Sequence, residues 1–271
     1  MKLLVISLLC VIANADNSAR LSGGVTTFTG QYPAVVSIDS PYILHCGGTI
    51  VDLQHVLTAA SCVMHPTTFS LVNPHWLRVI AGDLNLVPAS YHREVRNVSR
   101  LFVHPNYNNE TNNNDLAVLR LSRPFPEFHN TIEPAILATR AFTYGTQCRY
   151  VGWGTTTSGP TAAINPTQRS INVPIIAAVE CNVPTVHNFR VLPAMICAGS
   201  LTATPDTTCQ GNVGGGLYCN EQLAGVLIFG LACGSANQPG VYTDVRQYRQ
   251  WIYSQFDRTD NPQPGWLPQP L

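Results

Sequence analysis

DTTCQGNVGGGLYC, residues 206–219, places a run of glycines between two cysteines. A glycine run of this kind allows a tight turn that presents one side chain beside backbone N–H donors, which is the geometry a nucleophile needs. The residue at the centre is Val213, whose side chain has no nucleophilic atom. The stretch has the form of a catalytic loop without its catalytic group. Motifs elsewhere in the chain are needed to interpret it.

The N-terminus predicts export of the chain. Residues 1–15, MKLLVISLLCVIANA, combine Lys2, an apolar run and an Ala-x-Ala end, which is typical of a secretory signal peptide cut after Ala15. The run is too short to span a bilayer and no other stretch qualifies, so we expect a secreted, extracellular protein without a membrane partner. We expect a monomer.

Composition limits the function classes. The chain has 271 residues, of which 45% are hydrophobic and 11% charged, enough for the core of one large or two small domains. Beyond the signal peptide, fourteen arginines and fifteen acidic residues give a net charge of −1, without a basic block. A nucleic-acid partner therefore has no electrostatic support.

Cysteine usage agrees with an oxidising compartment. Eight cysteines remain after the signal peptide, and an even number in a secreted chain predicts four disulfides, although spacing alone allows 105 pairings. The alternative is a metal site, but no Cys-x-x-Cys pair occurs and the histidines are not clustered near the cysteines. We therefore expect no metal and no cofactor. The cysteines are Cys46, Cys62, Cys148, Cys181, Cys197, Cys209, Cys219 and Cys233.

Short β-rich runs between turn residues predict an all-β sandwich or barrel. Near the C-terminus, Val245, Tyr248, Ile252 and Phe256 fall close to a helical stripe, which predicts one helix over about 244–256. The runs are at 34–38, 77–82, 116–121, 223–230 and 240–245.

Two further features lie outside these runs. Residues 257–271 hold four prolines and read as an extended tail, with docking through Trp266 as the alternative. Asn97-Val98-Ser99 and Asn109-Glu110-Thr111 are N-glycosylation sequons, and in a secreted chain we expect each to carry a glycan on the surface.

Several motifs occur together in a fixed order. CGGTIVDLQHVLTAASC at 46–62, NNNDLAVLRL at 112–121 and the quoted 206–219 stretch are joined by RLSGG at 20–24, GWG at 152–154 and PGVYTDV at 239–245. Together they resemble the trypsin/chymotrypsin family of serine proteases, from Leu21 to about Phe256.

The resemblance implies a chymotrypsin-like fold: two six-stranded antiparallel β-barrels, an active-site cleft between them and a C-terminal α-helix. The chain would divide into a signal peptide (1–15), a short pro-segment (16–20), the protease-like domain (21–256) and the proline-rich tail (257–271). The implied disulfides are Cys46–Cys62, Cys148–Cys219, Cys181–Cys197 and Cys209–Cys233.

The resemblance also assigns a catalytic triad, and two of its three positions are changed. The family's general base is a histidine in LTAA-H-C, where this chain has Ser61, whose hydroxyl cannot accept a proton near neutral pH. The aspartate that orients the base is present as Asp115. The nucleophile position holds Val213, and Gly211 and Val213 are what remains of the oxyanion hole. The pattern predicts a loop that descends from a catalytic one and has lost catalysis.

The family's activation device is altered as well. Cleavage between Arg20 and Leu21 would free a new N-terminus, whose amine in the family pairs with an aspartate just before the nucleophile. Here that residue is Asn212, which is neutral, and a buried ammonium without a carboxylate is costly. We expect cleavage to produce little switching, and the alternative is that Arg20 is a leftover processing site.

The implied substrate groove is better preserved. Thr207 would floor the primary pocket, with Gly230 and Gly240 as its walls, so an acidic floor is not indicated. The strand that pairs with substrate would contain Ile228, Phe229 and Gly230, and its main chain could bind an extended peptide by strand addition. The alternative is that the groove is inherited and unused.

The calcium loop of this family is not evident. Asp83 and Glu94 flank the corresponding region, but the residues between them supply no further acidic ligand.

These features predict a secreted, non-catalytic serine protease homologue that acts by binding, similar to the arthropod homologues that lack triad residues. Its partner would be a protease, a protease inhibitor or a component of an immune or clotting pathway, toward which it would serve as regulator, cofactor or decoy. The alternative is an active serine-type endopeptidase with an unusual mechanism.

Overall fold

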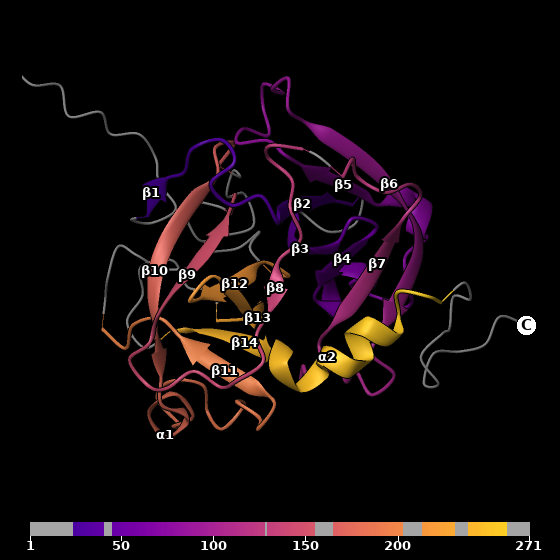
Figure 1. The fold of residues 1–271 in the computed structure, drawn as a ribbon. Helices are drawn as coiled ribbons and strands as arrows, with labels where there is room; N and C mark the ends of the chain where they lie inside the picture. The colour runs from indigo at the N-terminus through magenta and orange to yellow at the C-terminus, as the bar shows by residue number, and fades with distance from the viewer. Residues whose placement is uncertain are drawn as a thin grey trace, which may run out of the picture.

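The computed structural model describes residues 24–40, 45–127, 129–154, 165–202, 213–230 and 238–258. Within these residues the N-terminal half forms a closed antiparallel barrel in the order β2-β3-β4-β7-β6-β5, which lies on the right in Figure 1. Its strands are β2 (Val35–Asp39), β3 (Cys46–Asp52), β4 (His55–Thr58), β5 (Arg78–Ala81), β6 (Glu94–Val103) and β7 (Ala117–Leu121).

The C-terminal half forms a second barrel in the order β10-β11-β14-β13-β12-β9, closed by the pairing of β9 with β10. This confirms the two six-stranded antiparallel barrels expected from the sequence. The strands are β9 (Gln147–Gly152), β10 (Arg169–Ile176), β11 (Met195–Ala198), β12 (Gly216–Cys219), β13 (Gln222–Phe229) and β14 (Gly240–Asp244).

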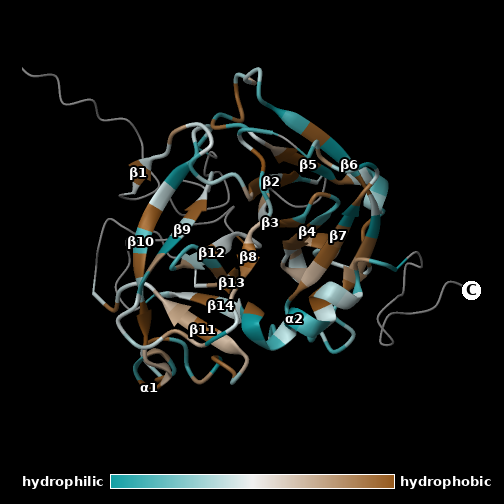
Figure 2. Cartoon of the chain, viewed as in Figure 1, coloured by the Kyte–Doolittle hydropathy of each residue, from teal (hydrophilic) through white to brown (hydrophobic). Residues whose placement is uncertain are grey.

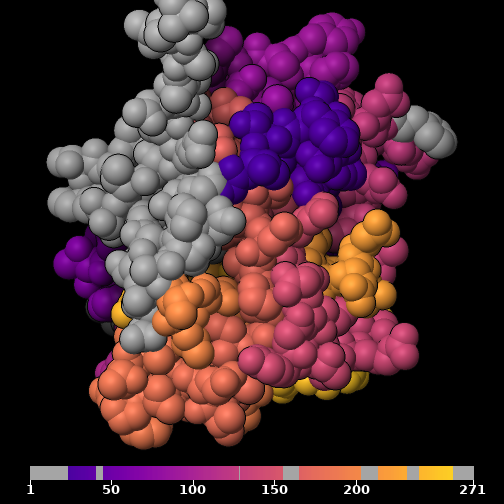
Figure 3. Space-filling view, turned by 90° about the vertical axis from the view of Figure 1, so that its left-hand side faces the viewer, coloured from indigo at the N-terminus to yellow at the C-terminus, as the bar shows by residue number. Residues whose placement is uncertain are grey.

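Two short strands extend the second sheet. β1 (Val25–Thr26) pairs with β10, and Figure 3 shows this face, where indigo residues of the first described segment lie above the salmon residues of the second barrel. β8 (Ile136–Leu137), in the connection between the barrels, runs parallel to β13. The chain passes between the barrels at these positions, so both strands help to fix one barrel against the other.

The core is continuous across the two barrels. Leu57 and Leu119 of the first barrel and Val226 and Ile228 of the second belong to one cluster of buried side chains. Burial of a leucine or valine side chain contributes about 1.5–3 kcal/mol, so the shared cluster holds the barrels together strongly. Figure 2 shows hydrophobic segments along the strands of both barrels, while helix α2 (Val245–Ser254) is largely hydrophilic on its visible face.

Helix α2 confirms the predicted C-terminal helix. The Asp244 side chain caps it by accepting a hydrogen bond from the Arg246 backbone N–H, and the helix buries Val245, Tyr248 and Ile252. Among the described residues, no helix has the length and apolar character that crossing a membrane requires.

Three short helices were not expected. They are α1 (Ala178–Cys181) and two 3-10 helices, η1 (Ala60–Val63) and η2 (Pro74–Trp76). Four residues or fewer carry no hydrophobic period, so sequence pattern alone does not reveal such turns.

Three of the four implied disulfides are formed: Cys46–Cys62, Cys148–Cys219 and Cys181–Cys197. The first and third each join residues 16 apart, whereas the second closes a loop of 71 residues within the second barrel. The implied Cys209–Cys233 bond lies outside the described residues, as do the signal peptide, the Arg20–Leu21 site and residues 259–271 of the tail.

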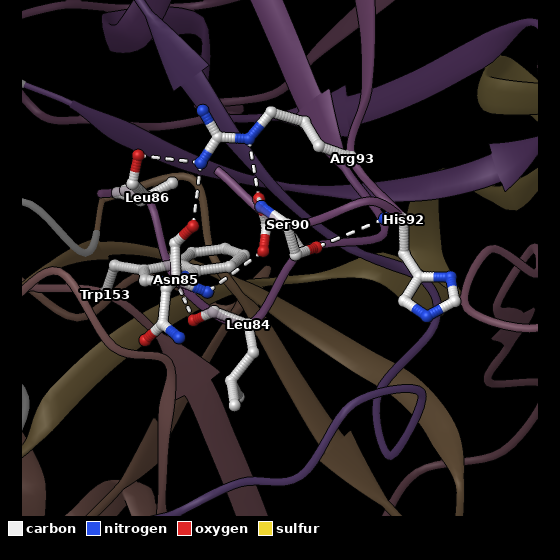
Figure 4. A network of polar contacts seen from close by, with 8 residues as sticks. Leu84, Asn85, Leu86, Ser90, His92, Arg93 and Trp153 are labelled. Carbon is white, nitrogen blue, oxygen red and sulfur yellow. Dashed lines mark hydrogen bonds and ion pairs between the residues drawn. The ribbon is translucent and has the colours of Figure 1, made fainter. Parts of the chain in front are cut away.

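A buried ion pair organises the loop between β5 and β6. The Asp83 carboxylate accepts hydrogen bonds from Arg93 Nε at 2.6 Å, Ser90 N at 3.0 Å and Asn85 N at 3.2 Å. The Arg93 guanidinium also donates to the Asn85 and Leu86 carbonyls, each at 2.7 Å (Figure 4). Because the loop's own groups occupy this carboxylate, Asp83 serves here as the partner of Arg93.

The same loop contacts the second barrel. Trp153 Nε1 donates to the Leu84 carbonyl at 2.9 Å, a bond that is drawn in Figure 4. Glu94, the other acid considered for a cation, accepts a hydrogen bond from Arg96 at 2.6 Å. Burial tends to raise the pKa of Asp83, but the hydrogen bonds from Ser90 and Arg93 outweigh it and hold that pKa below its ordinary value.

Arg93→Ala should destabilise the protein substantially. It leaves the Asp83 carboxylate, whose side chain is 1% exposed, without its cation, and breaking a buried pair in this way costs about 3–5 kcal/mol. The measurement is urea unfolding at pH 7 with the disulfides intact. Arg78→Ala is the matched control, because Arg78 is 61% exposed in its pair with Asp39 and its loss should cost about 1 kcal/mol or less. Equal losses in the two variants would contradict this role for Arg93.

Candidate functional site

The three positions assigned to the triad come together between the barrels. Ser61 lies in η1, directly after β4, and Asp115 lies just before β7. Val213 precedes β12 of the second barrel, and its carbonyl accepts a hydrogen bond from Gly47 N of the first barrel at 2.8 Å. The sequence prediction that these distant segments share one site is consistent with this placement.

Asp115 is bound to Ser61 through two hydrogen bonds. The Ser61 backbone N–H donates to Asp115 Oδ1 at 2.8 Å, and the Ser61 hydroxyl donates to Oδ2 at 2.9 Å. The Ala60 backbone N–H also donates to this carboxylate. The Asp115 carbonyl accepts a hydrogen bond from Thr243 Oγ1 at 2.9 Å, which ties the residue to β14.

The environment of Asp115 is unfavourable for a charge. Its side chain is fully buried, and none of its contacts in the described part of the chain comes from a cation. Burial raises its pKa to about 6, although the hydrogen bonds from Ser61 and Ala60 act in the opposite direction. Asp115 is therefore a buried carboxyl group that only neutral donors stabilise.

No histidine bonds to this carboxyl group. All eight histidines lie in the described residues, and within these residues the Asp115 carboxyl group accepts hydrogen bonds only from Ser61 and Ala60. His55, the histidine nearest to Ser61 in the sequence, instead bonds through Nδ1 to Asp52 at 2.7 Å and stacks on Phe256 with ring centroids 4.8 Å apart. A serine hydroxyl that donates to a carboxylate cannot take up a proton near neutral pH.

The glycines after Val213 pack closely against the first barrel and against β9 of the second. Gly214 has φ +83°, and a Cβ there would lie 2.2 Å from Thr58 Oγ1 and 2.4 Å from the Gly47 carbonyl oxygen. A Cβ on Gly215 would lie 2.1 Å from the Tyr150 hydroxyl. The glycine run is thus required by the fold itself, whether or not the loop carries a nucleophile.

The pairing of β13 with β14 is irregular near its C-terminal end, where the register shifts between Leu227 and Phe229. Backbone bonds join Gly214 N to the Leu227 carbonyl at 2.8 Å and Leu227 N to the Gly215 carbonyl at 2.9 Å. The next residue, Ile228, lies at this irregularity, and Phe229 pairs with Val241 of β14.

The two glycines assigned to pocket walls are closely packed, and neighbouring atoms leave no room for a side chain at either position. A Cβ on Gly230 would lie 2.2 Å from the Pro239 carbonyl oxygen, and one on Gly240 would lie 2.8 Å from the Tyr242 ring. These glycines allow close packing of the wall segments. Thr207 and Gly211, the assigned floor and oxyanion residues, lie outside the described residues, as does Asn212.

Sequence reasoning missed a cluster beside the C-terminal end of β13. The Arg190 guanidinium lies over the Phe229 ring at 4.8 Å from its centroid, and the His187 ring meets the same ring edge-on at 5.5 Å. His187 and Arg190 come from the loop between α1 and β11, which carries no recognisable motif. No pattern in the sequence links this loop to Phe229.

The two sequons lie at different depths. Asn97 is exposed on β6, whereas Asn109 is half-buried in the loop between β6 and β7. Glycosylation of both remains a prediction.

A cavity of about 720 Å³ lies elsewhere between the barrels. Tyr32, Arg149 and Tyr218 are among its lining residues, and Ser61, Asp115 and Val213 are not. It is therefore separate from the triad positions.

The fold and this site define a serine protease scaffold, and comparison with known proteins gives its family. Residues 21–252 match the family model described as Trypsin, so the chain belongs to the trypsin family.

Individual relatives agree. The chain is 31% identical to Trypsin of Xenopus laevis over 252 residues, which covers 93% of this chain and 97% of that protein. It is 32% identical to Trypsin-2 of Salmo salar, covering 89% and 97% of the two chains. It is 31% identical to Serine protease 1 of Rattus norvegicus, covering 88% and 90%.

As pH rises, the unfolding free energy of the Asp115→Asn variant should increase relative to that of the natural chain. A folded-state pKa of about 6 against an ordinary 3.8 means that the folded protein binds this proton more tightly than the unfolded chain. The protonated Asp115 carboxyl group therefore contributes to the free energy of unfolding at low pH. This contribution is lost as pH rises through about 4 to 6, and the loss is roughly 2–3 kcal/mol. Urea unfolding of both proteins at pH 4 and pH 7.5 should show the difference in unfolding free energy moving in favour of asparagine by this amount.

Asp83→Asn is the control for this measurement. The pKa of Asp83 is lowered from 3.8, so its contribution to stability is lost mainly below that pH and should change little between pH 4 and pH 7.5. An Asp115→Asn difference that is equally flat would show that folding does not raise the pKa of Asp115, contrary to this description of its environment.

Proposed function

We propose that this member of the trypsin family is a secreted, non-catalytic homologue that acts by binding another protein. It would serve as a regulator, cofactor or decoy in an extracellular proteolytic or immune pathway, as the arthropod-type homologues that lack triad residues do. The partner would be a protease, a protease inhibitor or an immune or clotting component.

One observation carries this proposal. The carboxyl group of Asp115, which would orient a base, is hydrogen-bonded to the Ser61 N–H and hydroxyl at 2.8 and 2.9 Å. Acyl transfer by a triad needs a base that can accept a proton and a nucleophile that the base can activate. The pair of Asp115 and Ser61 supplies no base, and Val213 supplies no nucleophile.

Secretion is supported independently by sequence and structure. The first fifteen residues have the composition of a signal peptide, and three disulfides are formed. Disulfides persist in oxidising compartments, which fits a protein outside the cell. The preserved packing of residues 214 and 215 fits a scaffold that is maintained for binding after catalysis is lost.

An active endopeptidase of unusual mechanism is the competing proposal. The names of the relatives favour it, since those of Xenopus laevis and Salmo salar are called trypsins. It would require a base and a nucleophile from other residues. Without a triad, oxyanion and binding effects alone leave roughly 10³–10⁴-fold acceleration over water, which is negligible for peptide bonds.

Restoring the triad tests the proposal. Three chains are compared after cleavage behind Arg20: the natural chain, a triple variant (Ser61→His, Asn212→Asp, Val213→Ser), and the same variant with Val213→Ala in place of Val213→Ser. The readout is hydrolysis of a mixed fluorogenic peptide library. The triple variant should exceed the natural chain by at least about 10³-fold, because it regains base and nucleophile, whereas the alanine control should not.

Hydrolysis by the natural chain within tenfold of the triple variant would overturn the non-catalytic proposal. A folded triple variant that stays inactive beside an inactive natural chain would leave that proposal standing. It would show instead that the cleft has changed at residues other than these three.

A further inference from the structure

The cavity that lies away from the triad positions is lined by charges of both signs. Its volume of about 720 Å³ falls within the range of roughly 300–1,000 Å³ that is usual for pockets that bind small ligands. Its lining residues come from 31–35 at the start of β2, from 133–136 in the connection between the barrels, and from β9, β10 and β12. A ligand in this cavity therefore contacts both barrels.

One wall is a row of three neighbouring residues on the second barrel. Arg149 of β9 pairs in register with Tyr218 of β12 on one side and with Asn172 of β10 on the other. Side chains that pair across strands stand on the same face of a sheet, and these three line the cavity. Arg149 Nη1 donates to the Tyr32 hydroxyl at 3.1 Å, and Nε donates to Asn172 Oδ1 at 3.3 Å.

The charge of Arg149 is not neutralised by these contacts. Both acceptors are neutral, and within the described residues Arg149 forms no ion pair. The two hydrogen bonds hold the guanidinium in place, so it loses little further freedom when it binds an anion. Its remaining N–H groups can bind a carboxylate.

Two carboxylates line the same cavity. Glu133 lies in the connection between the barrels, and Glu221 lies in the two-residue turn between β12 and β13. β8 runs beside β13 with Ile136 opposite Gln222, so the connection passes close to this turn. Both glutamates are exposed, and in the part of the chain that the structure describes neither forms an ion pair. The cavity thus holds one positive and two negative groups that do not neutralise one another.

Glu221 stands at a backbone position that favours glycine. Its φ is +63° and that of Asn220 is +47°, as in the hairpin turns that prefer glycine or asparagine at such positions. This conformation is strained for a residue with a Cβ and easy for glycine. The turn therefore gives no backbone reason for a glutamate, and its carboxylate is available to a ligand.

The spacing of the charges limits the kind of ligand. Arg149 pairs with Tyr218, and Glu221 follows three residues later, just past the end of β12. Strand geometry, with about 3.3 Å per residue and about 4.8 Å between strands, puts the two backbone positions on the order of 10 Å apart. The guanidinium and the carboxylates are thus separate binding points. They suit a ligand whose opposite charges are one long side chain apart.

We propose that this cavity binds a peptide that ends in arginine or lysine with a free C-terminal carboxylate. The terminal carboxylate bonds to the Arg149 guanidinium, and the basic side chain of the same residue lies between Glu133 and Glu221. The aliphatic stem of that side chain packs on the apolar lining residues Ala34 and Pro134.

The charges exclude simpler ligands. A plain cation would leave Arg149 without a counter-charge, and a plain anion would leave both glutamates without one. Termini of the proposed kind are left by proteolysis after basic residues, so the site recognises a product of that class of reaction. The inference does not depend on the proposed function, because Ser61, Asp115 and Val213 do not line the cavity.

Peptide binding tests this inference. The full secreted chain is titrated with three fluorescein-labelled pentapeptides, and binding is read by anisotropy. The first is Gly-Ala-Ser-Ala-Arg with a free carboxylate, the second is its C-terminal amide, and the third is the free acid with Gln in place of Arg. The first should bind about 10-fold more tightly than either of the others, because each of them lacks one charge-assisted contact.

Two variants separate the roles of the charges. Arg149→Gln should remove the preference for the free acid over the amide and keep the preference for Arg over Gln. Glu221→Gln should do the converse: the preference for Arg should fall at least about threefold, since one of two carboxylates is lost, while the preference for the free acid remains.

Arg123→Gln and Glu180→Gln are the matched controls. Both residues are exposed and absent from the cavity lining, and each variant makes the same change in net charge as its counterpart. Both controls should keep both preferences. They also exclude a general effect of net charge on peptide binding.

Two results would overturn the inference. One is that the natural chain binds the three peptides equally, or binds none of them at up to millimolar concentration. The other is that Arg149→Gln and Glu221→Gln leave both preferences unchanged, which would put the binding at another site. Neither result would bear on the non-catalytic proposal, whose failure would appear as peptide hydrolysis by the natural chain.

Discussion

The two hydrogen bonds between Ser61 and Asp115 are the constraint on which the chemistry of this protein depends. A carboxyl group buried between two barrels needs partners, because an unpaired charge in the interior is costly. In this chain the partners are the N–H and hydroxyl of Ser61, together with the Ala60 N–H. They satisfy the oxygens of Asp115 without providing a group that could exchange protons at neutral pH. Asp115 thus links η1, through Ser61, with β14, which it contacts through Thr243.

The same separation of structure from chemistry holds for the glycine run. Gly214 and Gly215 have neighbours so close that any side chain would collide with Thr58 or Tyr150. Their presence follows from how the loop packs between the barrels, so it does not depend on which side chain stands at position 213. Sequence similarity to the family in this stretch therefore predicts the fold reliably, but it is a poor predictor of catalytic activity. Activity depends on the few atoms at positions 61 and 213, which the packing does not specify.

Much of the fold could be predicted from the sequence, and the reasons are physical. Strands such as β2 and β13 bury nearly continuous apolar runs, helix α2 has a 3.6-residue stripe, and the motif order implied three of the disulfides seen. The family pattern assigned Ser61 and Asp115 to one site, but the two hydrogen bonds between them were not predicted. The ion pair of Asp83 with Arg93, the stacking of Arg190 on Phe229 and the short α1 did not. The side-chain contacts depend on how loops fold against their surroundings, and α1 is too short to leave a period in the sequence.

If the natural chain is non-catalytic, it cannot form a covalent intermediate with a substrate or a reactive probe. The direct measurement is reaction of the secreted chain, before and after verified cleavage behind Arg20, with a fluorophosphonate probe, followed by peptide mapping of any labelled site. We expect no label on the peptide that contains residues 206–219, because Val213 offers no oxygen to phosphonylate. Stoichiometric labelling of that peptide, or of Ser61, would contradict it and would establish a working nucleophile in this site.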